Sequence, residues 1–439
     1  MSGAVTAVNE YQVAPAAQVS GELLVPGDKS ISHRSLMLGG IAAGETHISG
    51  FLASEDCLAT LGALRALGVQ IERPQPSRVV VHGAGIDGLH AASAPLDMGN
   101  AGTAMRLSMG LLAGRPFAST LIGDGSLMRR PMERVAAPLR QMGAAITTRE
   151  GHPPVLLHGG RQLTGIDYAM PMASAQVKSA VLLAALTASG RTRVTEPAPT
   201  RDHTERMLAA FGVQVERDGA TASLTGGQAL TGTHIDVPAD FSSAAFFLVA
   251  GALAAPDGLR LRNVGINPTR TGLLDMLQMM GAQIAVHPHA GSGEPIADLE
   301  VHASRLRGVE VPPHLVPLSI DEFPVFFIAA ACAEGETVVR GAEELRVKES
   351  DRLAVMAEGL KTLGVEHTLL PDGIRIRGGQ GFSGGTVDSH GDHRIAMSFA
   401  IASLKARDPI RILDVANVAT SFPGFVELAQ SVGIRIAAL

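Results

Sequence analysis

The sequence predicts an α/β protein built from six similar units, arranged as two lobes of three. The first observation is a segment that recurs six times, in which an apolar helical stretch ends at a glycine and a short strand-like run follows. The second is that these segments are nearly evenly spaced. The third is the length of the chain, because 439 residues exceed what one hydrophobic core usually supports.

Six glycines mark the ends of the recurring helices. Their spacings are 75, 69, 69, 83 and 69 residues. A glycine directly after an apolar helical stretch adopts the left-handed capping conformation without a Cβ penalty. Such a repeat indicates one supersecondary unit used several times, so chemistry is expected in the segments that do not repeat. The glycines are Gly68, Gly143, Gly212, Gly281, Gly364 and Gly433.

The first helix of each unit, which precedes the glycine-capped helix, is expected to begin at a polar segment. These segments are 26–34, 98–106, 171–179, 238–247, 320–327 and 389–397. Helix N-termini carry free N–H groups and a partial positive charge, which favour anions. We therefore expect a cleft that holds several negative groups, with ordinary solvated helix caps as the alternative. The cations that support the cleft are Lys29, Arg34, Arg106, Lys178 and Arg394.

The six units divide into three and three with a circular offset. The sixth unit reaches Leu439 before its last strand, and the run 11–25 is expected to supply that strand. Lobe one is then 26–237, and lobe two is 1–25 plus 238–439. Both crossings contain a Val-Pro pair, which favours a stiff, extended hinge.

Composition narrows the function classes. A net charge of −6 and 3 % aromatic residues argue against a nucleic-acid partner. Cys57 and Cys332 lie in apolar helical contexts and are expected to be buried thiols, which fits a reducing compartment. We see no secretory pattern, and the longest apolar run, Ala244–Ala255, is short of the roughly 20 residues that span a bilayer. We expect a cytoplasmic protein without membrane association.

Two short motifs are interpreted as structural. Gly83–Gly88 matches GxGxxG, but a dinucleotide site would need a helix to begin there. His287 and His289 resemble a metal-binding pair, yet no third ligand is nearby, and we expect this pair on a loop. No metal site is predicted.

Several segments combine residue types that bind and transform anions. Lys29, Ser30 and Arg34 offer a cationic proton donor, a hydroxyl and a guanidinium that grips phosphate or carboxylate. The small residues of 99–103 admit a ligand close to the backbone. The segment 346–352 carries five formal charges.

Carboxylates accompany these cations. Asp321 and Glu322 form a pair at the start of the fifth unit, and Asp392-His393-Arg394 begins the sixth. A carboxylate among many cations is a candidate general base, which Lys348 or His393 could tune.

Seven motifs, in this order, resemble those of the 5-enolpyruvylshikimate-3-phosphate (EPSP) synthase family. They are PGDKSISHR, GNAGTAMR, RRPM, MASAQVKSA, RDHTE, RVKESDR and GDHRIAMS, within residues 25–425. The resemblance implies two lobes, each of three βαβαββ units. It implies transfer of the enolpyruvyl group of phosphoenolpyruvate to the 5-hydroxyl of shikimate 3-phosphate, with release of phosphate, in chorismate and aromatic amino acid biosynthesis. It also implies no metal or organic cofactor, and we expect a monomer.

The resemblance further implies residue roles. Asp321 is expected to act as the base toward the 5-hydroxyl, Glu349 to handle the methylene proton of phosphoenolpyruvate, and Lys29 to assist as acid and charge stabiliser. Expected contacts of shikimate 3-phosphate are Lys29, Ser30, Arg34, Ser174, Ala175, Gln176, Arg201, Asp321 and Lys348. Expected contacts of phosphoenolpyruvate are Lys29, Gly102, Arg130, Gln176, Arg352 and Arg394.

Some positions depart from the best-known bacterial branch of that family. This chain has Thr420 where that branch has Lys, Glu344 where it has Asn, and Leu107 where it has Pro. These departures resemble a second branch that is often tolerant of the herbicide glyphosate. Gly102, however, is the small residue associated with sensitivity, so we expect intermediate or greater sensitivity.

Two alternative functions stay open. A UDP-amino-sugar enolpyruvyl transferase is expected to carry a reactive Cys where this chain reads GDGSLMRRPM (123–132). The other alternative is an RNA 3′-phosphate cyclase-like or phosphate-binding protein. The pI of about 6.2 and the few aromatic residues argue against this alternative.

Overall fold

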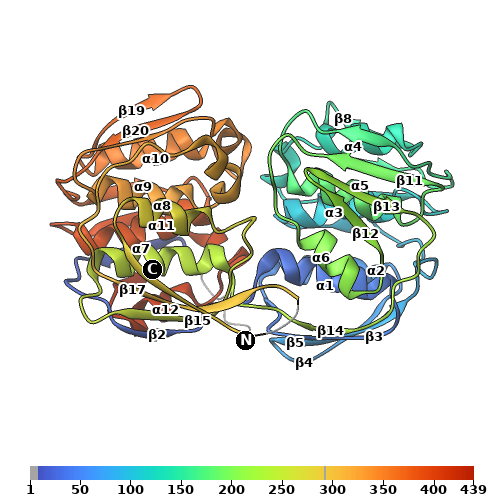
Figure 1. Ribbon diagram of the computed structural model, residues 1–439, viewed down its shortest axis with the longest axis horizontal. Coiled ribbons are helices and arrows are strands. Elements are labelled where there is room, and N and C mark those ends of the chain that lie inside the picture. The colour runs from blue at the N-terminus through green and yellow to red at the C-terminus, as the bar shows by residue number, and fades with distance from the viewer. Residues whose placement is uncertain (1–7, 291–292) are drawn as a thin grey trace, which may run out of the picture. The chain divides into compact units, whose positions relative to one another are not determined.

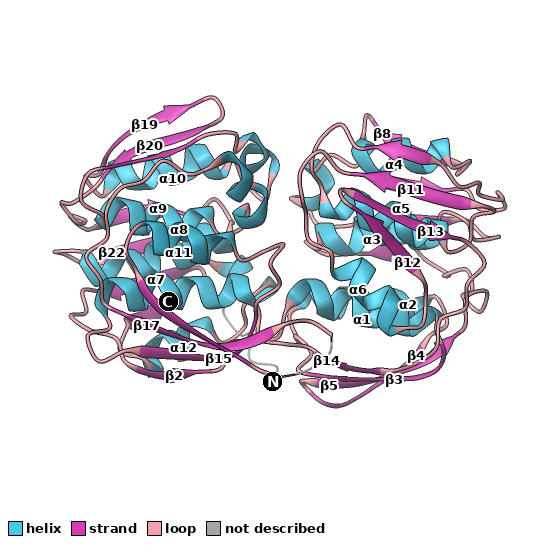
Figure 2. Cartoon of the chain, viewed as in Figure 1, coloured by secondary structure: helices cyan, strands magenta, loops and turns pink. Residues whose placement is uncertain are grey.

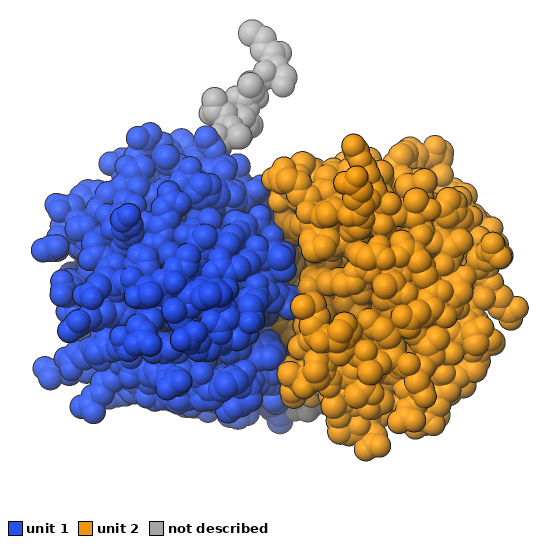
Figure 3. Space-filling model, turned by 90° about the horizontal axis from the view of Figure 1, so that it is seen from above, with its two compact units in different colours: residues 1–26, 239–291, 295–439 blue, residues 27–238, 292–294 orange. Residues whose placement is uncertain are grey.

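The computed structural model describes residues 8–290 and 293–439. They form two compact units, shown in different colours in Figure 3. Of the described residues, unit 1 contains 8–26, 239–290 and 295–439, and unit 2 contains 27–238 and 293–294. Two of the passages from one unit to the other follow Pro26 and Pro238, where a proline restricts the backbone.

Unit 2 contains three repeats (Figure 1). The first contains α1 (Lys29–Ile41), β3 (Ala43–Ser49), α2 (Glu55–Ala66), β4 (Gln70–Gln75) and β5 (Arg78–Ala84), completed by β14 (His234–Asp236). The second contains β6 (Leu96–Asp97), α3 (Gly102–Leu112), β7 (Ser119–Ile122), the 3₁₀ turn η1 (Leu127–Arg129), α4 (Glu133–Gln141), β8 (Ile146–Arg149) and β9 (His152–Leu157). The third contains β10 (Asp167–Ala169), α5 (Ala175–Ala185), β11 (Arg191–Thr195), α6 (His203–Ala210), β12 (Val215–Asp218) and β13 (Thr221–Thr225).

Unit 1 also contains three repeats. The fourth repeat of the chain contains β2 (Gly21–Leu23), α7 (Phe241–Ala254), β15 (Leu259–Gly265), α8 (Gly272–Met279), β16 (Gln283–Pro288) and β17 (Ile296–His302). The fifth contains η2 (Pro313–Leu315), η3 (Pro317–Ser319), α9 (Phe323–Cys332), β18 (Glu336–Val339), η4 (Glu343–Val347), α10 (Arg352–Thr362), β19 (Glu366–Leu370) and β20 (Gly373–Arg377). The sixth contains β21 (Gly385–Asp388), α11 (His393–Ala402), η5 (Ser403–Lys405), β22 (Ile410–Leu413), η6 (Ala416–Thr420), α12 (Phe425–Ser431), β23 (Arg435–Ala438) and β1 (Glu10–Ala14).

Each repeat forms its own small sheet. The orders in unit 2 are β14-β3-β5-β4, β6-β7-β9-β8 and β10-β11-β13-β12, and those in unit 1 are β2-β15-β17-β16, β18-β20-β19 and β21-β22-β1-β23. In every four-stranded sheet the first pair is parallel and the other two are antiparallel. In the fifth repeat, parallel bridges from Arg307 and Glu310 take the place of the first strand. The expected βαβαββ repeat is therefore confirmed.

The circular offset has two parts. Strand β1 lies between β22 and β23, so the N-terminal run completes the sixth sheet as expected. The sequence did not predict the second part, in which the first strands of two repeats are exchanged. Strand β2 precedes α1 in the chain but pairs with β15, whereas β14 precedes α7 but pairs with β3.

The six glycines end the second helix of each repeat as expected. Their φ angles lie between 81° and 104°, in the left-handed region that favours glycine. A backbone hydrogen bond then closes the helix end, from Val69 N to Leu64 O in the first repeat and from Ile434 N to Ala429 O in the last.

The core of unit 1 is built around the first helix of each repeat. Helices α7, α9 and α11 contact one another, and Figure 2 shows strands around the helices of this unit. Every residue of α7 is buried, as expected for a helix that is apolar on all sides. The rings of Phe422 and Phe425 lie 5.5 Å apart in an edge-to-face arrangement, worth about 0.5–1.5 kcal/mol beyond burial.

The structure also tests the minor motifs. No helix begins directly after Gly83–Gly88, because strand β6 comes first and the next helix, α3, begins only at Gly102. The prediction that the histidine pair lies on a loop is wrong for His287, which lies on strand β16, whereas His289 directly follows that strand. Cys57 is buried and Cys332 partly so, both as free thiols. No helix among the described residues has the length and apolarity needed to cross a membrane.

Candidate active site

Most of the site residues singled out in the sequence lie at or near helix starts in both units. In unit 2 they are at the N-termini of α1, α3 and α5, and in unit 1 at those of α9, α10 and α11. The side chains of Asp28, Ser174 and Asp392 cap α1, α5 and α11 by accepting from backbone N–H groups. The predicted helix starts are therefore confirmed, and the cluster in each unit is described below by itself.

Lys29 and Arg34 project from α1 in unit 2. Lys29 Nζ lies 2.6 Å from Asp56 Oδ2, a contact to α2 that the sequence did not indicate. Arg34 donates through Nε to Thr204 Oγ1 at 2.7 Å, and through Nη2 to Ser179 Oγ at 2.8 Å. Burial lowers the pKa of Arg34 to about 10, which still leaves it charged at neutral pH.

A third bond of Arg34 connects it to another predicted residue. Its Nη1 donates to the backbone carbonyl of Ser30 at 2.9 Å. This bond fixes the guanidinium against the first turn of α1, so Ser30 and Arg34 lie together as expected.

Arg106, Gln176 and Thr103 form a chain of hydrogen bonds between α3 and α5. Arg106 Nη1 donates to Gln176 Oε1 at 2.7 Å, and Gln176 Nε2 donates to Thr103 Oγ1 at 2.9 Å. Arg130 Nη2 donates to Asn100 Oδ1 at 2.5 Å. These bonds hold two buried guanidinium groups beside the first turn of α3.

Gly102 is the first residue of α3 and lies between those two guanidinium groups. A Cβ atom at this position would be 3.0 Å from Arg130 Nη1 and 3.2 Å from Arg106 Nη1. Any side chain would therefore occupy space next to both cations. The absence of a side chain leaves this space beside the two guanidinium groups unfilled by Gly102 itself.

Ser174, Ala175 and Gln176 form the first turn of α5. Ser174 Oγ accepts from Val177 N at 3.4 Å, and Ala175 and Gln176 are partly exposed. Arg201 lies two residues before α6 and is partly exposed. These residues share unit 2 with Lys29 and Arg34.

The role expected for Lys178 as a cleft cation is wrong. Its side chain is 1 % exposed and lies 2.8 Å from Glu205 and 3.1 Å from Glu196. Its Nζ also donates to the carbonyl of Thr200 at 3.3 Å. Lys178 points into the interior because Val177–Ala185 of α5 are buried on all sides, and it ties α5 to the segment that carries Arg201.

Arg352 is the centre of the cluster in unit 1. It is 1 % exposed and donates to three carboxylates: Asp392 from Nε at 2.8 Å, Asp321 from Nη1 at 3.3 Å, and Glu349 from Nη2 at 2.7 Å. Burial lowers the pKa of Arg352, but the carboxylates of Asp392, Glu349 and Asp321 outweigh it and raise that pKa above its ordinary value.

Lys348 and Arg394 complete this cluster. Lys348 Nζ lies 3.3 Å from Glu344 and 3.8 Å from Asp321 Oδ1. Arg394 Nη1 donates to the backbone carbonyl of Asp321 at 3.2 Å. Glu344, one of the departures from the best-known branch, thus contacts Lys348, and the expected residues of unit 1 lie within one cluster.

Sequence reasoning missed the partners that hold these side chains. Asp392 is completely buried and contacts Arg352, Ser350 and the N-terminus of α11. The sequence named it as a carboxylate at the start of the sixth unit, but not as a partner of Arg352, which lies 40 residues away. Asp56 and Thr204 carry no local signal, because they lie 27 and 170 residues from the side chains that they contact.

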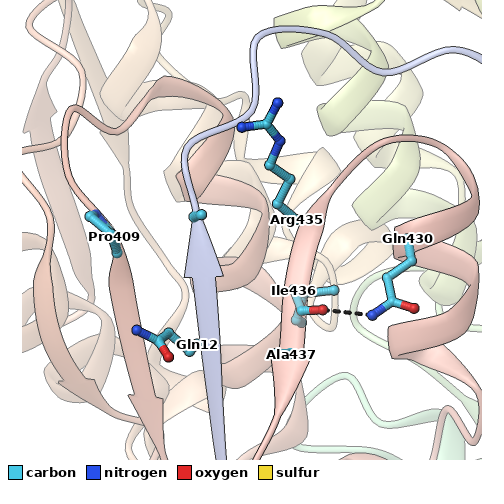
Figure 4. Close-up of a pocket in the computed structure, with 7 residues that line it drawn as sticks. Gln12, Pro409, Gln430, Arg435, Ile436 and Ala437 are labelled. Atoms are coloured by element: carbon cyan, nitrogen blue, oxygen red, sulfur yellow. Dashed lines mark hydrogen bonds between the residues drawn. The ribbon is translucent and has the colours of Figure 1, made fainter.

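Two surface hollows lie away from these clusters. The one in unit 1 has a volume of about 380 Å³, and the bond from Gln430 Nε2 to the Ile436 carbonyl, 2.7 Å long, closes one side (Figure 4). The one in unit 2, about 370 Å³, is lined by Arg191 and Glu216 among others. Neither is lined by a predicted site residue. Among the described residues, no group of three or more His, Cys, Asp or Glu side chains is placed to hold a metal ion.

Comparisons with known proteins identify the family. Residues 13–428 match the family model described as EPSP synthase (3-phosphoshikimate 1-carboxyvinyltransferase). The chain is 60 % identical over 428 residues to 3-phosphoshikimate 1-carboxyvinyltransferase of Methylococcus capsulatus, covering 97 % of this chain and 98 % of that one. It is also 59 % identical to the protein of the same name from Alkalilimnicola ehrlichii, covering 97 % of this chain and 96 % of that one.

A solved structure agrees with this assignment. EPSP synthase from Acinetobacter baumannii superposes with a TM-score of 0.88 at 53 % identity, covering 98 % of this chain and all of that one. This level of identity and coverage, over motifs that form the two clusters described above, places the chain in the EPSP synthase family.

Proposed function

We propose that this protein is a 3-phosphoshikimate 1-carboxyvinyltransferase. It transfers the enolpyruvyl group of phosphoenolpyruvate to the 5-hydroxyl of shikimate 3-phosphate and releases phosphate. Family membership supports this activity, and the observation that carries it is the Arg352 cluster. That cluster holds Asp321 and Glu349 on one guanidinium, at 3.3 and 2.7 Å, which suits a reaction that moves protons at two different atoms, the acceptor oxygen and the methylene carbon.

The proposed reaction is an addition followed by an elimination. Asp321 takes the proton of the 5-hydroxyl while the hydroxyl oxygen bonds to C2 of phosphoenolpyruvate, and Glu349 supplies a proton to the methylene carbon. In the second step Glu349 takes a proton back from the new methyl group, and the bond from C2 to the phosphate oxygen breaks. Lys29 stabilises the charge of the departing phosphate and assists as an acid.

The proposed binding roles come from the family resemblance, and the two clusters support them. From unit 2 we assign Lys29, Ser30, Arg34, Ser174, Ala175, Gln176 and Arg201 to shikimate 3-phosphate, and from unit 1 Asp321 and Lys348. For phosphoenolpyruvate we assign Lys29, Gly102, Arg130 and Gln176 from unit 2, and Arg352 and Arg394 from unit 1. Both substrates carry a phosphate and a carboxylate, so several guanidinium and ammonium groups are needed to bind them.

We further propose that the enzyme acts as a monomer in the cytoplasm. The two free thiols fit a reducing compartment. Light scattering at the concentration used in the assay tests the monomer, and fractionation of the native cells tests the compartment.

The choice of acceptor separates this function from its nearest alternative. The protein is incubated with phosphoenolpyruvate and either shikimate 3-phosphate or a UDP-amino sugar, and phosphate release is measured. We expect release with shikimate 3-phosphate alone. Release with the UDP-amino sugar alone would contradict the proposal and assign the chain to the sister reaction.

A further inference from the structure

A buried polar network lies directly beside Asp321 in unit 1. Its members are Ser242 in the first turn of α7, Arg270 in the loop before α8, and Glu322 at the N-cap of α9. Their exposed fractions are 2 %, 2 % and 1 %. None of the three was predicted to touch a substrate. Buried polar groups are retained only where hydrogen bonds compensate for the loss of water, so this network requires an explanation.

Hydrogen bonds connect the network from one helix start to the next. Ser242 Oγ donates to Glu322 Oε1 and accepts from Arg270 Nη2 at 2.8 Å. Arg270 Nη2 also donates to Asp240 Oδ1 at 3.0 Å. Asp240 caps α7 by accepting from Ser243 N at 2.8 Å. The side chain of Glu322 is therefore anchored to the first turn of α7, a helix that contacts α9 (Figure 1).

The backbone on both sides of Asp321 is fixed as well. Glu322 N donates to Ser319 O at 2.9 Å, and Phe326 N donates to Glu322 O at 3.0 Å. A Cβ atom on Gly272, at the start of α8, would be 2.3 Å from Ser319 Oγ, so α8 lies directly against the turn before Asp321. The peptide between Ser319 and Glu322 has little room to move.

The side chains of Glu322 and Asp321, which are neighbours in this turn, contact different groups. The Glu322 side chain enters the buried network, while the Asp321 side chain extends to Arg352 and Lys348. A rotation of the turn that released Glu322 would also displace the Asp321 carboxylate. A displacement of about 1 Å is enough to lower a catalytic rate by about 100-fold.

We propose that Glu322, through Ser242 and Arg270, is a positioning residue that aims the Asp321 carboxylate. This inference rests on the proposed function, in which Asp321 takes the proton of the acceptor hydroxyl. Glu322 touches no substrate in this account. It contributes by holding the base at the distance and angle that proton transfer requires.

Three variants test the proposal in the full chain. Ser242→Ala removes the hydroxyl that connects Arg270 to Glu322, and Glu322→Ala removes the anchor itself. Glu322→Gln keeps an acceptor oxygen for Ser242. Ser243→Ala is the matched control, because its hydroxyl lies in the same helical turn and bonds to Asp240 rather than to Glu322.

We expect kcat to fall about 10- to 100-fold in Ser242→Ala and Glu322→Ala, with the dissociation constant of shikimate 3-phosphate changed by less than about threefold. Glu322→Gln should retain most of the wild-type kcat, and Ser243→Ala should match the wild type. If kcat stays at the wild-type value in both Ser242→Ala and Glu322→Ala, the proposal is wrong.

A double-mutant experiment separates positioning from a general structural role. Ser242→Ala is repeated in an Asp321→Asn background, where it should lower the residual single-turnover rate by less than about twofold, because the group it positions is gone. An equal loss in both backgrounds would overturn the proposal. A wild-type protein that releases no phosphate would instead defeat the proposed function, and the inference with it.

Discussion

Arg34 of unit 2 and Arg352 of unit 1 donate to different kinds of acceptor. In unit 2, Arg34 donates to two hydroxyls and a backbone carbonyl. In unit 1, Arg352 donates to three carboxylates. A neutral acceptor orients a guanidinium without offsetting its charge, whereas a carboxylate offsets it. The first arrangement suits the binding of anions, and the second suits the placing of carboxylates that move protons.

This difference predicts that substitutions in the two clusters will have different kinetic signatures. Loss of a carboxylate around Arg352 should lower turnover. Loss of an arginine in unit 2 should weaken substrate binding. The four predictions below are ordered from the largest expected effect to the smallest.

Glu349→Ala should lower kcat by about 100- to 10,000-fold, the range that general acid–base groups contribute. The dissociation constant of shikimate 3-phosphate should change by only a few-fold, because Glu349 is assigned to the methylene proton of the other substrate. Stopped-flow phosphate release and titration calorimetry measure the two quantities. Weakened shikimate 3-phosphate binding at normal turnover would reverse the role given to this cluster.

Arg130→Ala should raise KM for phosphoenolpyruvate by about 10- to 100-fold, since hydrogen bonds to charged groups contribute about 1.5–3 kcal/mol. Arg129→Ala is the matched control, because Arg129 is the preceding residue and is exposed. Steady-state kinetics at saturating shikimate 3-phosphate gives both values. An equal rise in KM for the two variants would mean that general charge, rather than the position beside Gly102, explains binding.

Gly102→Ala should raise the inhibition constant of glyphosate about tenfold, with a smaller rise in KM for phosphoenolpyruvate. The added methyl would lie 3.0 Å from Arg130 Nη1, in space that the longer inhibitor needs. A difference of one methyl-sized group in a binding pocket changes the relative affinity for two ligands by about 1–3 kcal/mol. An unchanged inhibition constant would show that the inhibitor does not occupy this space.

His33→Gln should change how stability depends on pH. Burial, with smaller contributions from Lys29 and Arg34, lowers the pKa of His33 to about 3. Between that value and the unfolded pKa of about 6.5, only the unfolded chain binds the proton, so the free energy of unfolding falls by about 1.4 kcal/mol for each pH unit of acidification. His33 Nδ1 lies 2.7 Å from Thr60 Oγ1, and glutamine cannot titrate but can still bond to Thr60.

Urea unfolding at about pH 7 and about pH 5 measures this effect, which should approach about 2 kcal/mol. The variant should lose that much less stability than the wild type over the interval. His47→Gln, at an exposed histidine, is the control and should follow the wild type. A variant with the wild-type pH dependence would mean that His33 is protonated in the folded protein.

The sequence was sufficient for the parts of the fold that depend on local geometry. The capping glycines have a steric cause within their own turn, so their spacing revealed the repeats. The same holds for the helix starts at Asp28, Ser174 and Asp392, where a side chain satisfies the backbone three residues away or fewer. The ordered family motifs then supplied the residues of both clusters.

The sequence could not show contacts between distant residues. The exchange of β2 and β14 concerns strands of three residues each, too short to reveal their partners. Lys178 resembled the other cations near the helix starts, and only its 1 % exposure and its ion pairs with Glu196 and Glu205 show that it is buried among carboxylates. The partners of Asp392 and Glu322 were missed for the same reason, since Arg352 and Ser242 lie 40 and 80 residues away from them.

The most direct test of the comparison between the clusters is phosphate release by the wild type and by Asp321→Asn, with each substrate omitted in turn. We predict release that requires both substrates and that falls by at least about 100-fold in the variant, while shikimate 3-phosphate still binds. Release by the variant at the wild-type rate would contradict the assignment of proton transfer to the carboxylates around Arg352. A wild type that binds shikimate 3-phosphate but releases no phosphate would contradict the proposed reaction itself.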